Sequence, residues 1–410
     1  MADGERRGGS ALRVLGRRNF APYFVGNLLS NCGTWFQNIA QSLLVYRLTG
    51  SAFMVGVANF AQFAGVVLLA PWAGGAADRY DRKRLIIATQ FGAMAVTGAL
   101  AALSASGEGT VAVVIVLALL LGFTTAFSTP ALQAILPQLV DREDLGSAIA
   151  MNSVTFNLSR AVGPVAGAFI VARLGIPWAF GLNALSYAAL IAGLLLVHPR
   201  ETHGRPKEHP KLRESLRLVR ENRDLALLLA TVAAVSIAMD PVNTLGPVFA
   251  TRIFHRADTV AGVLIGAFGA GAVLASFLPG GQADTPYGRV GMMVFLLGAG
   301  MTGFAIAPGF ALGLAVLAAA GFGYLAGQTR ATTLLQLQVS DQQRGRIMAL
   351  WSVAFLGSRP IASLADGALA SAAGPRIATL LMTIPAYAAA AALVLHGGRA
   401  KPAEELARDD

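Results

Sequence analysis

Gly74 to Arg84 read G-G-A-A-D-R-Y-D-R-K-R, a charged segment between two long apolar runs of this 410-residue chain. A weaker copy, G-G-Q-A-D-T-P-Y-G-R, extends from Gly280 to Arg289. The first glycine and the aspartate of the copy both follow their counterparts by 206 residues (280 − 74 and 284 − 78). A charged turn that interrupts membrane-like hydrophobicity and returns half a chain later indicates a duplicated bundle of membrane helices.

The composition of the chain is that of a membrane protein: 55% of its residues are hydrophobic, 13% are charged, and its mean hydropathy is +0.59. Soluble domains carry about 25% charged residues, so that class is excluded. Apolar stretches of about 20 residues indicate membrane-spanning helices, and the alternation typical of a transmembrane β-barrel is absent from the sequence. Twelve spans are expected, at residues 21–45, 54–77, 86–105, 110–128, 146–170, 176–196, 225–250, 259–279, 291–307, 310–328, 347–370 and 376–395.

The net charge of +10 is spread unevenly over the loops. Five of the 32 Lys and Arg residues lie on one side of the expected bundle, and three lie within or at the edge of spans. The other 24 (32 − 5 − 3) lie on the side of the two tails. Basic residues accumulate in cytoplasmic loops, so the pattern predicts that both termini are cytoplasmic. The basic surplus therefore reflects topology and does not indicate a nucleic-acid partner.

An internal repeat predicts two six-helix halves. N-S-V-T-F-N-L-S-R at Asn152–Arg160 matches W-S-V-A-F-L-G-S-R at Trp351–Arg359 at five of nine positions, with an offset of 199 (359 − 160). Gly122 and Gly321 share this offset. The basic N-tail runs into a full-length span without a small-residue cleavage site, which predicts an uncleaved first helix. The predicted parts are an N-tail (1–19), an N-terminal bundle (20–197), a basic cytoplasmic linker (198–223), a C-terminal bundle (224–396) and a C-tail (397–410).

A polar stripe follows the first expected helix, where the spacing 4-3-4-3 places five side chains on one face. Such groups are costly against lipid, so the face is expected to line a cavity or to contact another helix through hydrogen bonds. Trp35 and Gln37 flank this face. The stripe consists of Asn27, Asn31, Thr34, Asn38 and Gln41.

Charged side chains are also expected deep in the membrane. Arg160 and Arg359 occupy equivalent positions in the two halves, and Asp366 follows Arg359 by two turns on the same helix face. Asp240 is followed by Pro241, Asn243, Thr244 and Pro247, so a helix break is expected there. The arginines and Asn243 are candidates for binding polar or anionic cargo, whereas Asp240 and Asp366 are candidates for proton coupling. A set of structural salt bridges is an equal alternative.

The segment Gly74–Arg84 resembles the loop signature G-x-x-x-D-R-x-G-R-[KR] of the major facilitator superfamily. Residues 27–40 (N-L-L-S-N-C-G-T-W-F-Q-N-I-A) and 46–51 (Y-R-L-T-G-S), with Ser159-Arg160…Gly163-Pro164, look like the branch of bacterial enterobactin-exporter-like and transmembrane secretion-effector proteins. The resemblance implies the major facilitator fold, with twelve helices in two pseudo-symmetric bundles. It also implies a monomer that exports a small molecule such as a siderophore, antibiotic or amphipathic metabolite across the bacterial inner membrane.

The resemblance also implies residues that control the conformational cycle. It assigns a cytoplasmic latch to Gly74, Asp78, Arg79 and Arg82, with Asp284 in the second copy, and a helix hinge to Gly163, Pro164 and Gly167. Gly74 is expected to permit close helix approach, and Asp78 to accept hydrogen bonds from a helix N-terminus. Asp81 stands where the family pattern has glycine and is expected to tolerate a left-handed backbone.

Export by proton antiport is the favoured function, with uptake as the alternative and a transport-inactive receptor or scaffold as a less favoured one. The arginine that many proton-coupled exporters of the superfamily carry in their fourth helix is missing, so other residues would have to couple protons. The sequence has no P-loop and no cluster of His or Cys with metal spacing, and its one cysteine, Cys32, is expected to be a packing residue. We therefore expect no enzyme activity, no cofactor and no metal site.

Overall fold

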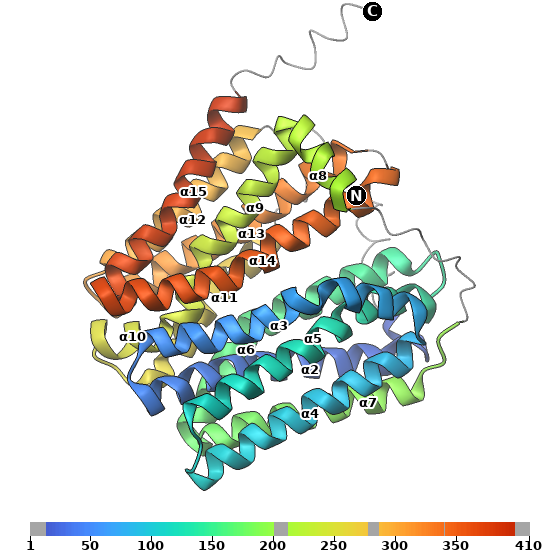
Figure 1. Ribbon diagram of the computed structural model, residues 1–410, viewed down its shortest axis with the longest axis horizontal. Coiled ribbons are helices and arrows are strands. Elements are labelled where there is room, and N and C mark those ends of the chain that lie inside the picture. The colour runs from blue at the N-terminus through green and yellow to red at the C-terminus, as the bar shows by residue number, and fades with distance from the viewer. Residues whose placement is uncertain (1–13, 201–211, 278–286, 340, 398–410) are drawn as a thin grey trace, which may run out of the picture. The chain divides into compact units, whose positions relative to one another are not determined.

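A computed structural model describes residues 14–200, 212–277, 287–339 and 341–397 (Figure 1). Asp284 and most of the repeated turn at 280–289 lie outside the described residues, as do residues 201–211 of the predicted linker, 1–13 of the predicted N-tail and 398–410 of the predicted C-tail. By their contacts, the described residues form two compact units, each of which packs around its own helices.

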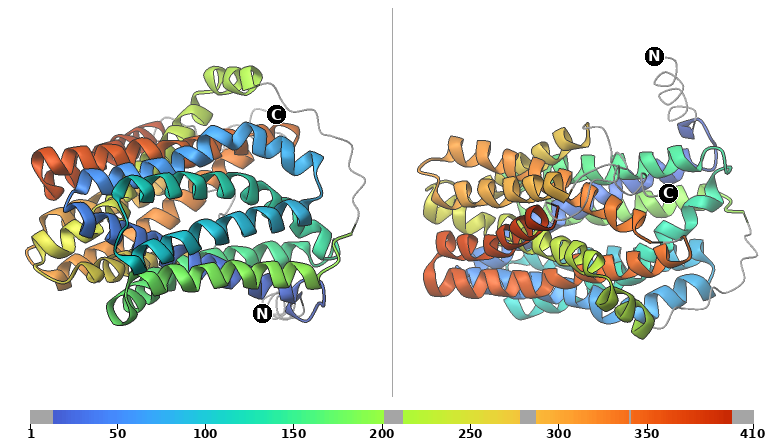
Figure 2. Two further views of the ribbon diagram at one scale, coloured as in Figure 1. Left: turned by 60° about the horizontal axis from the view of Figure 1, so that its bottom comes forward. Right: turned by 90° about the horizontal axis from the view of Figure 1, so that it is seen from above.

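The first unit contains six long helices that run alongside one another (Figures 1 and 2). Their ends follow local chemistry: Ser51 caps one helix by accepting a hydrogen bond from the backbone of Met54, and Gly50, Gly107 and Gly175 end helices with positive φ angles of 60°, 74° and 97°. The helices are α2 (Ala21–Thr49), α3 (Ala52–Arg79), α4 (Arg82–Ser106), α5 (Val111–Leu139), α6 (Leu145–Leu174) and α7 (Ile176–Leu196).

The second unit contains a short amphipathic helix, α8 (Leu212–Glu221), and the main part of six further helices. These are α9 (Arg223–Thr244), α11 (Ala261–Ser276), α12 (Tyr287–Ile306), α13 (Phe310–Leu337), α14 (Asp341–Ala373) and α15 (Pro375–Gly397). The connection from α9 to α11 is the exception to the chain order, because residues Thr244–Gly266 pack with the first unit.

The break expected after Asp240 is present. Helix α9 continues through Pro241 and ends at Thr244, and the chain then passes through the short α10 (Gly246–Val248), a π-helix η1 (Phe249–Ile253) and a 3₁₀ turn η2 (Asp258–Val260). Proline removes a backbone donor and clashes with the preceding turn, while Pro247 lies in the first turn of α10, where a proline is tolerated. Pro241 thus lies inside α9 three residues before its end, and Pro247 starts the next short helix.

Eleven helices in the described parts of the chain are long and apolar enough to cross a membrane. Helix α2 is as long as α5, at 29 residues, and it is absent from these eleven because its polar stripe lowers its hydropathy. Large apolar side chains are exposed on the surfaces of both units, among them Trp72 and Leu185 in the first unit and Phe277 and Ile361 in the second. Apolar exposure of this extent is typical of surfaces that contact lipid.

The repeat in the sequence is matched by a repeat of helix contacts. Helix α4 packs on α5 and α7 in the first unit, as α12 packs on α13 and α15 in the second. A Cβ on Gly122 would lie 2.1 Å from the carbonyl oxygen of Gln62, and Gly65 faces it. In the second unit a Cβ on Gly321 would lie 1.8 Å from the carbonyl oxygen of Phe268. Gly271 follows Gly65 by 206 residues and packs equally closely on α13, which reproduces both offsets of the sequence repeat.

Candidate transport site

The first half of the polar stripe on α2 is tied to its own helix and to α6. Asn27 is buried and donates from Nδ2 to Oδ1 of Asn152 at 2.9 Å. Asn31 donates to the backbone oxygen of Asn27 at 2.8 Å and to its side-chain oxygen at 3.1 Å, and Thr34 donates to the backbone of Ser30. Asn31 and Thr34 are half-buried, so polar atoms of this stripe are accessible beside a buried interhelical bond.

The second half of the stripe forms a chain of three amides with α3. Gln41 donates from Nε2 to Oε1 of Gln62 at 3.0 Å, and Gln62 donates in turn to Oδ1 of Asn38 at 3.3 Å. Gln41 is buried and its Oε1 accepts no hydrogen bond from the described residues. Of the two alternatives raised by the sequence, hydrogen bonding between helices is thus observed, and the lining of a cavity stays a prediction. Gln62 could have been noticed because it and Asn59 are the two amide residues of an otherwise apolar span.

Gln37, which only flanks the stripe, has the more extensive buried network. Its Oε1 accepts hydrogen bonds from Thr97 on α4 at 2.8 Å and from Asn183 on α7 at 2.6 Å. Asn183 also donates to the hydroxyl of Tyr187. All four side chains are buried, and their hydrogen bonds join α2, α4 and α7 of the first unit. The network therefore stabilises the packing of the helix that carries the stripe.

Arg160 lies on α6 with its guanidinium 5.9 Å from the ring of Trp35 on α2, within the range of a cation–π contact. Residues 163 and 167, the glycines of the expected hinge, face the same helix. A Cβ on Gly163 would lie 2.5 Å from Cβ of Trp35, and one on Gly167 would lie 2.8 Å from Phe36 and Ile39. The glycines therefore permit the close contact of α6 with α2, which sets the position of Arg160.

The second unit brings together polar residues of α9 and α14. Arg359, Ser363 and Asp366 follow each other at spacings of four and three, which places them on one face of α14. Nη2 of Arg359 lies 3.9 Å from the sulfur of Met239, and its guanidinium lies 5.2 Å from the ring of Phe355. Asn243, the last α9 residue in this unit, is half-buried.

Asp240 and Asp366 interact electrostatically and are both almost fully buried. Ser363 donates to Oδ2 of Asp240 at 2.8 Å. Neither carboxyl oxygen of Asp366 accepts a hydrogen bond of standard geometry from the described residues. Ser363 was not anticipated from the sequence, although its position between Arg359 and Asp366 on one helix face was a usable signal. Two carboxyl groups and one hydroxyl thus lie together in the buried interior, where an ionised carboxylate is unfavourable.

The charged segment Gly74–Arg84 connects α3 to α4 and is anchored within the first unit. Arg82 donates to the backbone oxygen of Ala134 near the end of α5 at 3.1 Å, and Lys83 donates to that of Val197 after α7 at 2.8 Å. Cations at helix C-termini complement the helix dipole. Asp78 and Arg79 are exposed. No atom of the described first unit lies within 4 Å of a Cβ built on Gly74, so the close helix approach expected there is not present.

Asp81 differs from what its place in the signature suggested. Its φ is −56°, so the left-handed backbone considered for it is wrong, and its side chain instead accepts a hydrogen bond from the backbone of Arg84 at 2.7 Å. Asp81 is therefore the N-cap of α4, a role that the sequence analysis had given to Asp78.

Replacing Asp81 by alanine should lower the stability of the protein by about 0.5–2 kcal/mol, because the cap is lost. Asp81→Gly, which restores the family pattern, should lower the stability by only about a few tenths of a kcal/mol. Thermal unfolding in detergent would measure both. An unchanged stability of Asp81→Ala would show that the cap contributes nothing.

Comparison with known proteins places this geometry among transporters. Residues 9–409 match the family described as transmembrane secretion effector. The staphyloferrin A transporter of Staphylococcus aureus is 27% identical over 62% of this chain; this match spans 65% of the relative, less than two thirds of its length. The enterobactin exporter of Citrobacter koseri is 27% identical over 81% of this chain and 80% of its own length. A solved bacterial homologue of the human lysosomal transporter Spinster superposes with a TM-score of 0.75 at 14% identity, covering 94% of this chain and 98% of the homologue.

Proposed function

The chain belongs to the transmembrane secretion effector family of the major facilitator superfamily, and from this membership we propose that it exports a siderophore-type small molecule in exchange for protons. It is a multi-pass membrane transporter and not an enzyme. The names of the two relatives each contain a siderophore, staphyloferrin A and enterobactin, which supports this cargo class. Alternating access of a central site, between the halves 20–197 and 224–396, is the proposed mechanism.

The buried pair Asp240 and Asp366 is the observation that carries the proton part of this proposal. Two carboxylates buried together repel each other, so ionising both is unfavourable. Ser363 donates to Asp240, while neither carboxyl oxygen of Asp366 accepts a hydrogen bond of standard geometry from the described residues. The pair is therefore suited to hold one proton and to release it when water reaches the site from the other side of the membrane.

Cargo recognition is assigned to the polar groups at comparable depth. Siderophores carry carboxylate, hydroxyl or catechol oxygens, which accept hydrogen bonds from guanidinium and amide groups. Arg160 beside Trp35, and Arg359 beside Phe355, combine a cation with an aromatic face. The half-buried Asn38 adds a neutral donor, and Asn31 adds an amide oxygen because its Nδ2 already donates to Asn27. Asn243 is included because it is half-buried at the end of the α9 part that belongs to the second unit.

The proposed topology has both termini in the cytoplasm of a bacterium and α2 as a twelfth span in the inner membrane. The distribution of Lys and Arg supports the orientation, and the packing of α2 beside α6 and α7 supports its crossing the membrane with them. In this orientation the anchored segment Gly74–Arg84 is cytoplasmic, where Gly74, Asp78, Arg79 and Arg82 are proposed to act as the latch. Asp284 is proposed for the second copy, and Gly163, Pro164 and Gly167 for the hinge.

Inside-out membrane vesicles provide the test. An acidic lumen and an alkaline bath should drive iron-free enterobactin or staphyloferrin A into vesicles that contain the protein, and a protonophore should abolish this accumulation. Accumulation that ignores the pH gradient would contradict proton coupling. Accumulation only in right-side-out vesicles would contradict export and favour uptake, and transport of neither compound would contradict the cargo class.

A further inference from the structure

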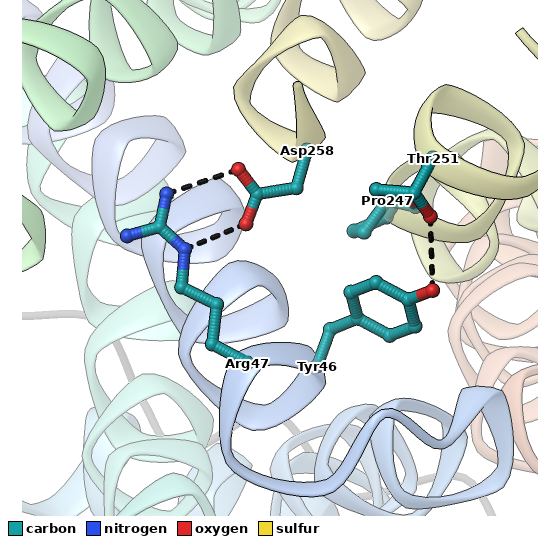
Figure 3. A network of polar contacts seen from close by, with 5 residues as sticks. All are labelled: Tyr46, Arg47, Pro247, Thr251 and Asp258. Atoms are coloured by element: carbon teal, nitrogen blue, oxygen red, sulfur yellow. Dashed lines mark hydrogen bonds and ion pairs between the residues drawn. The ribbon is translucent and has the colours of Figure 1, made fainter. Parts of the chain in front are cut away.

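The motif Y-R-L-T-G-S at residues 46–51 has no part in the proposed site, yet its first two residues make directional contacts with a segment 205–211 residues further along the chain. Arg47, in the last turn of α2, donates from Nε to Oδ2 of Asp258 at 2.6 Å and from Nη2 to Oδ1 at 3.0 Å. Figure 3 shows the two parallel bonds. A bidentate pair of this kind fixes both the distance and the orientation of its partners.

Asp258 belongs to the connection Thr244–Gly266, here called the strap, and further bonds hold the strap to the same unit. The hydroxyl of Tyr46 lies 2.9 Å from Oγ1 of Thr251, as Figure 3 also shows. Arg252 donates to the backbone oxygen of Gly50 at 3.0 Å, and Asn59 on α3 donates to Thr244 at 3.2 Å. The strap is thus bonded to α2, to the turn after it and to α3.

The far end of the strap rests on α6. A Cβ on Gly262 would lie 2.4 Å from the backbone oxygen of Pro164 and 2.2 Å from Cβ of Ala168, so the absence of a side chain permits backbone contact. Pro164 is the proline of the expected hinge. The strap therefore lies against two helices that carry candidate site residues, α2 and α6.

The ion pair between Arg47 and Asp258 is partly accessible to water, so it can break and form again. The side chain of Arg47 is 43% exposed and that of Asp258 is 16% exposed. Water reaches the guanidinium of this pair and can replace the carboxylate as its partner, so the pair can open without leaving a buried unpaired cation. Such contacts specify a position without making it permanent.

The strap connects two helices of the second unit, so its contacts with the first unit have to respond to any movement between the units. The strap is continuous with α9 and α11, whose main parts belong to the second unit, although the strap itself is bonded to the first. A movement of one unit relative to the other must therefore either release the strap from the first unit or bend those helices.

We propose that Arg47 and Asp258 are positioning residues of the transport cycle, whose ion pair holds the strap on the first unit in one state and opens in the other. This inference rests on the proposed function only for the existence of a transport cycle. The pair touches no candidate cargo or proton site. Its two parts, holding and opening, are separately testable.

Hydrogen exchange tests the holding part without any cargo. In Arg47→Ala, backbone amides of residues 246–260 should exchange about fivefold faster, the change that about 1 kcal/mol produces. The charge swap Arg47→Asp with Asp258→Arg should restore the slow rate. The control Arg217→Ala removes an ion pair with Glu221 in α8 and should leave the strap unchanged. Unchanged exchange of the strap in Arg47→Ala would overturn the proposal.

Cross-linking tests the opening part. In a Cys32→Ser background, a bifunctional methanethiosulfonate reagent would join Arg47→Cys to Asp258→Cys, and dithiothreitol would cleave the link. Cross-linked vesicles should lose uptake of enterobactin and regain it on reduction, while each single cysteine variant keeps uptake after the reagent. Full uptake by cross-linked protein would overturn the proposal. Failure of wild-type vesicles to transport would instead count against the proposed function, and hydrogen exchange would still decide on the ion pair.

Discussion

Asp366→Asn should reduce pH-driven accumulation in inside-out vesicles to the level of vesicles without the protein, while exchange of cargo across the membrane continues. Asparagine resembles a carboxyl group that is permanently protonated, so the carrier can still change conformation but cannot pick up and release a proton. Asp240→Asn should have the same effect because the two carboxyl groups act as one pair. Measurement requires two assays on the same preparation: gradient-driven uptake, and exchange of labelled for unlabelled enterobactin at equal pH.

Two variants serve as controls for the proton pair. Asp224→Asn makes the same chemical change on α9, the helix of Asp240, but at the start of that helix. There a carboxyl oxygen of Asp224 lies 2.8 Å from Nε2 of His396. This variant should keep gradient-driven uptake. Ser363→Ala removes the hydroxyl donor of Asp240 and should weaken uptake without abolishing it. Gradient-driven uptake that survives in both Asp240→Asn and Asp366→Asn would exclude the pair as the coupling site.

Gly122→Ala and Gly321→Ala should both destabilise the protein, by about 1–3 kcal/mol or more. In each case the new methyl group would lie about 2 Å from a backbone carbonyl oxygen, which cannot move without shifting a helix. The duplicated contact predicts effects of the same sign in the two units. Thermal unfolding of the purified protein, followed by size-exclusion chromatography with fluorescence detection, would measure them.

The matched control for the glycine variants is Gly98→Ala, also inside a long helix. Beyond its own helix, no atom of the described residues lies within 4 Å of its Cβ position, so only the better helix propensity of alanine acts and stability should stay equal or rise. Gly357→Ala, whose nearest neighbour is an ordinary contact at 3.7 Å, is the control in the second unit. If Gly122→Ala were as stable as Gly98→Ala, the close approach of α3 and α5 would be wrong.

Most of the fold could be predicted because hydropathy and repetition are local properties of the sequence. The membrane helices, the repeat offsets of 206 and 199, and the break after Pro241 all follow from patterns within one segment or between two matching segments. The mistake at Asp81 was also local. An aspartate directly before a helix is a normal cap, and the comparison with the family's glycine drew attention to backbone freedom instead.

The partners of the site residues could not be predicted, because they depend on how helices turn toward each other. Asp240 and Ser363 are 123 residues apart, and Gln62 lies one helix away from the stripe that it bonds. Hydropathy indicates which face of a helix is polar but does not identify the neighbour. The strap was least accessible, since π- and 3₁₀-turns carry no periodic signal and Arg47 and Asp258 are separated by 211 residues.

Helix α11 has a mechanical consequence that its sequence alone does not suggest. It runs without interruption from Ala261 to Ser276, while its first six residues (261–266) pack with one unit and the rest with the other. A regular helix resists bending, because its backbone hydrogen bonds lie along its axis. A displacement of the strap is therefore expected to be transmitted along α11 as along a stiff rod, into residues 267–276 of the second unit.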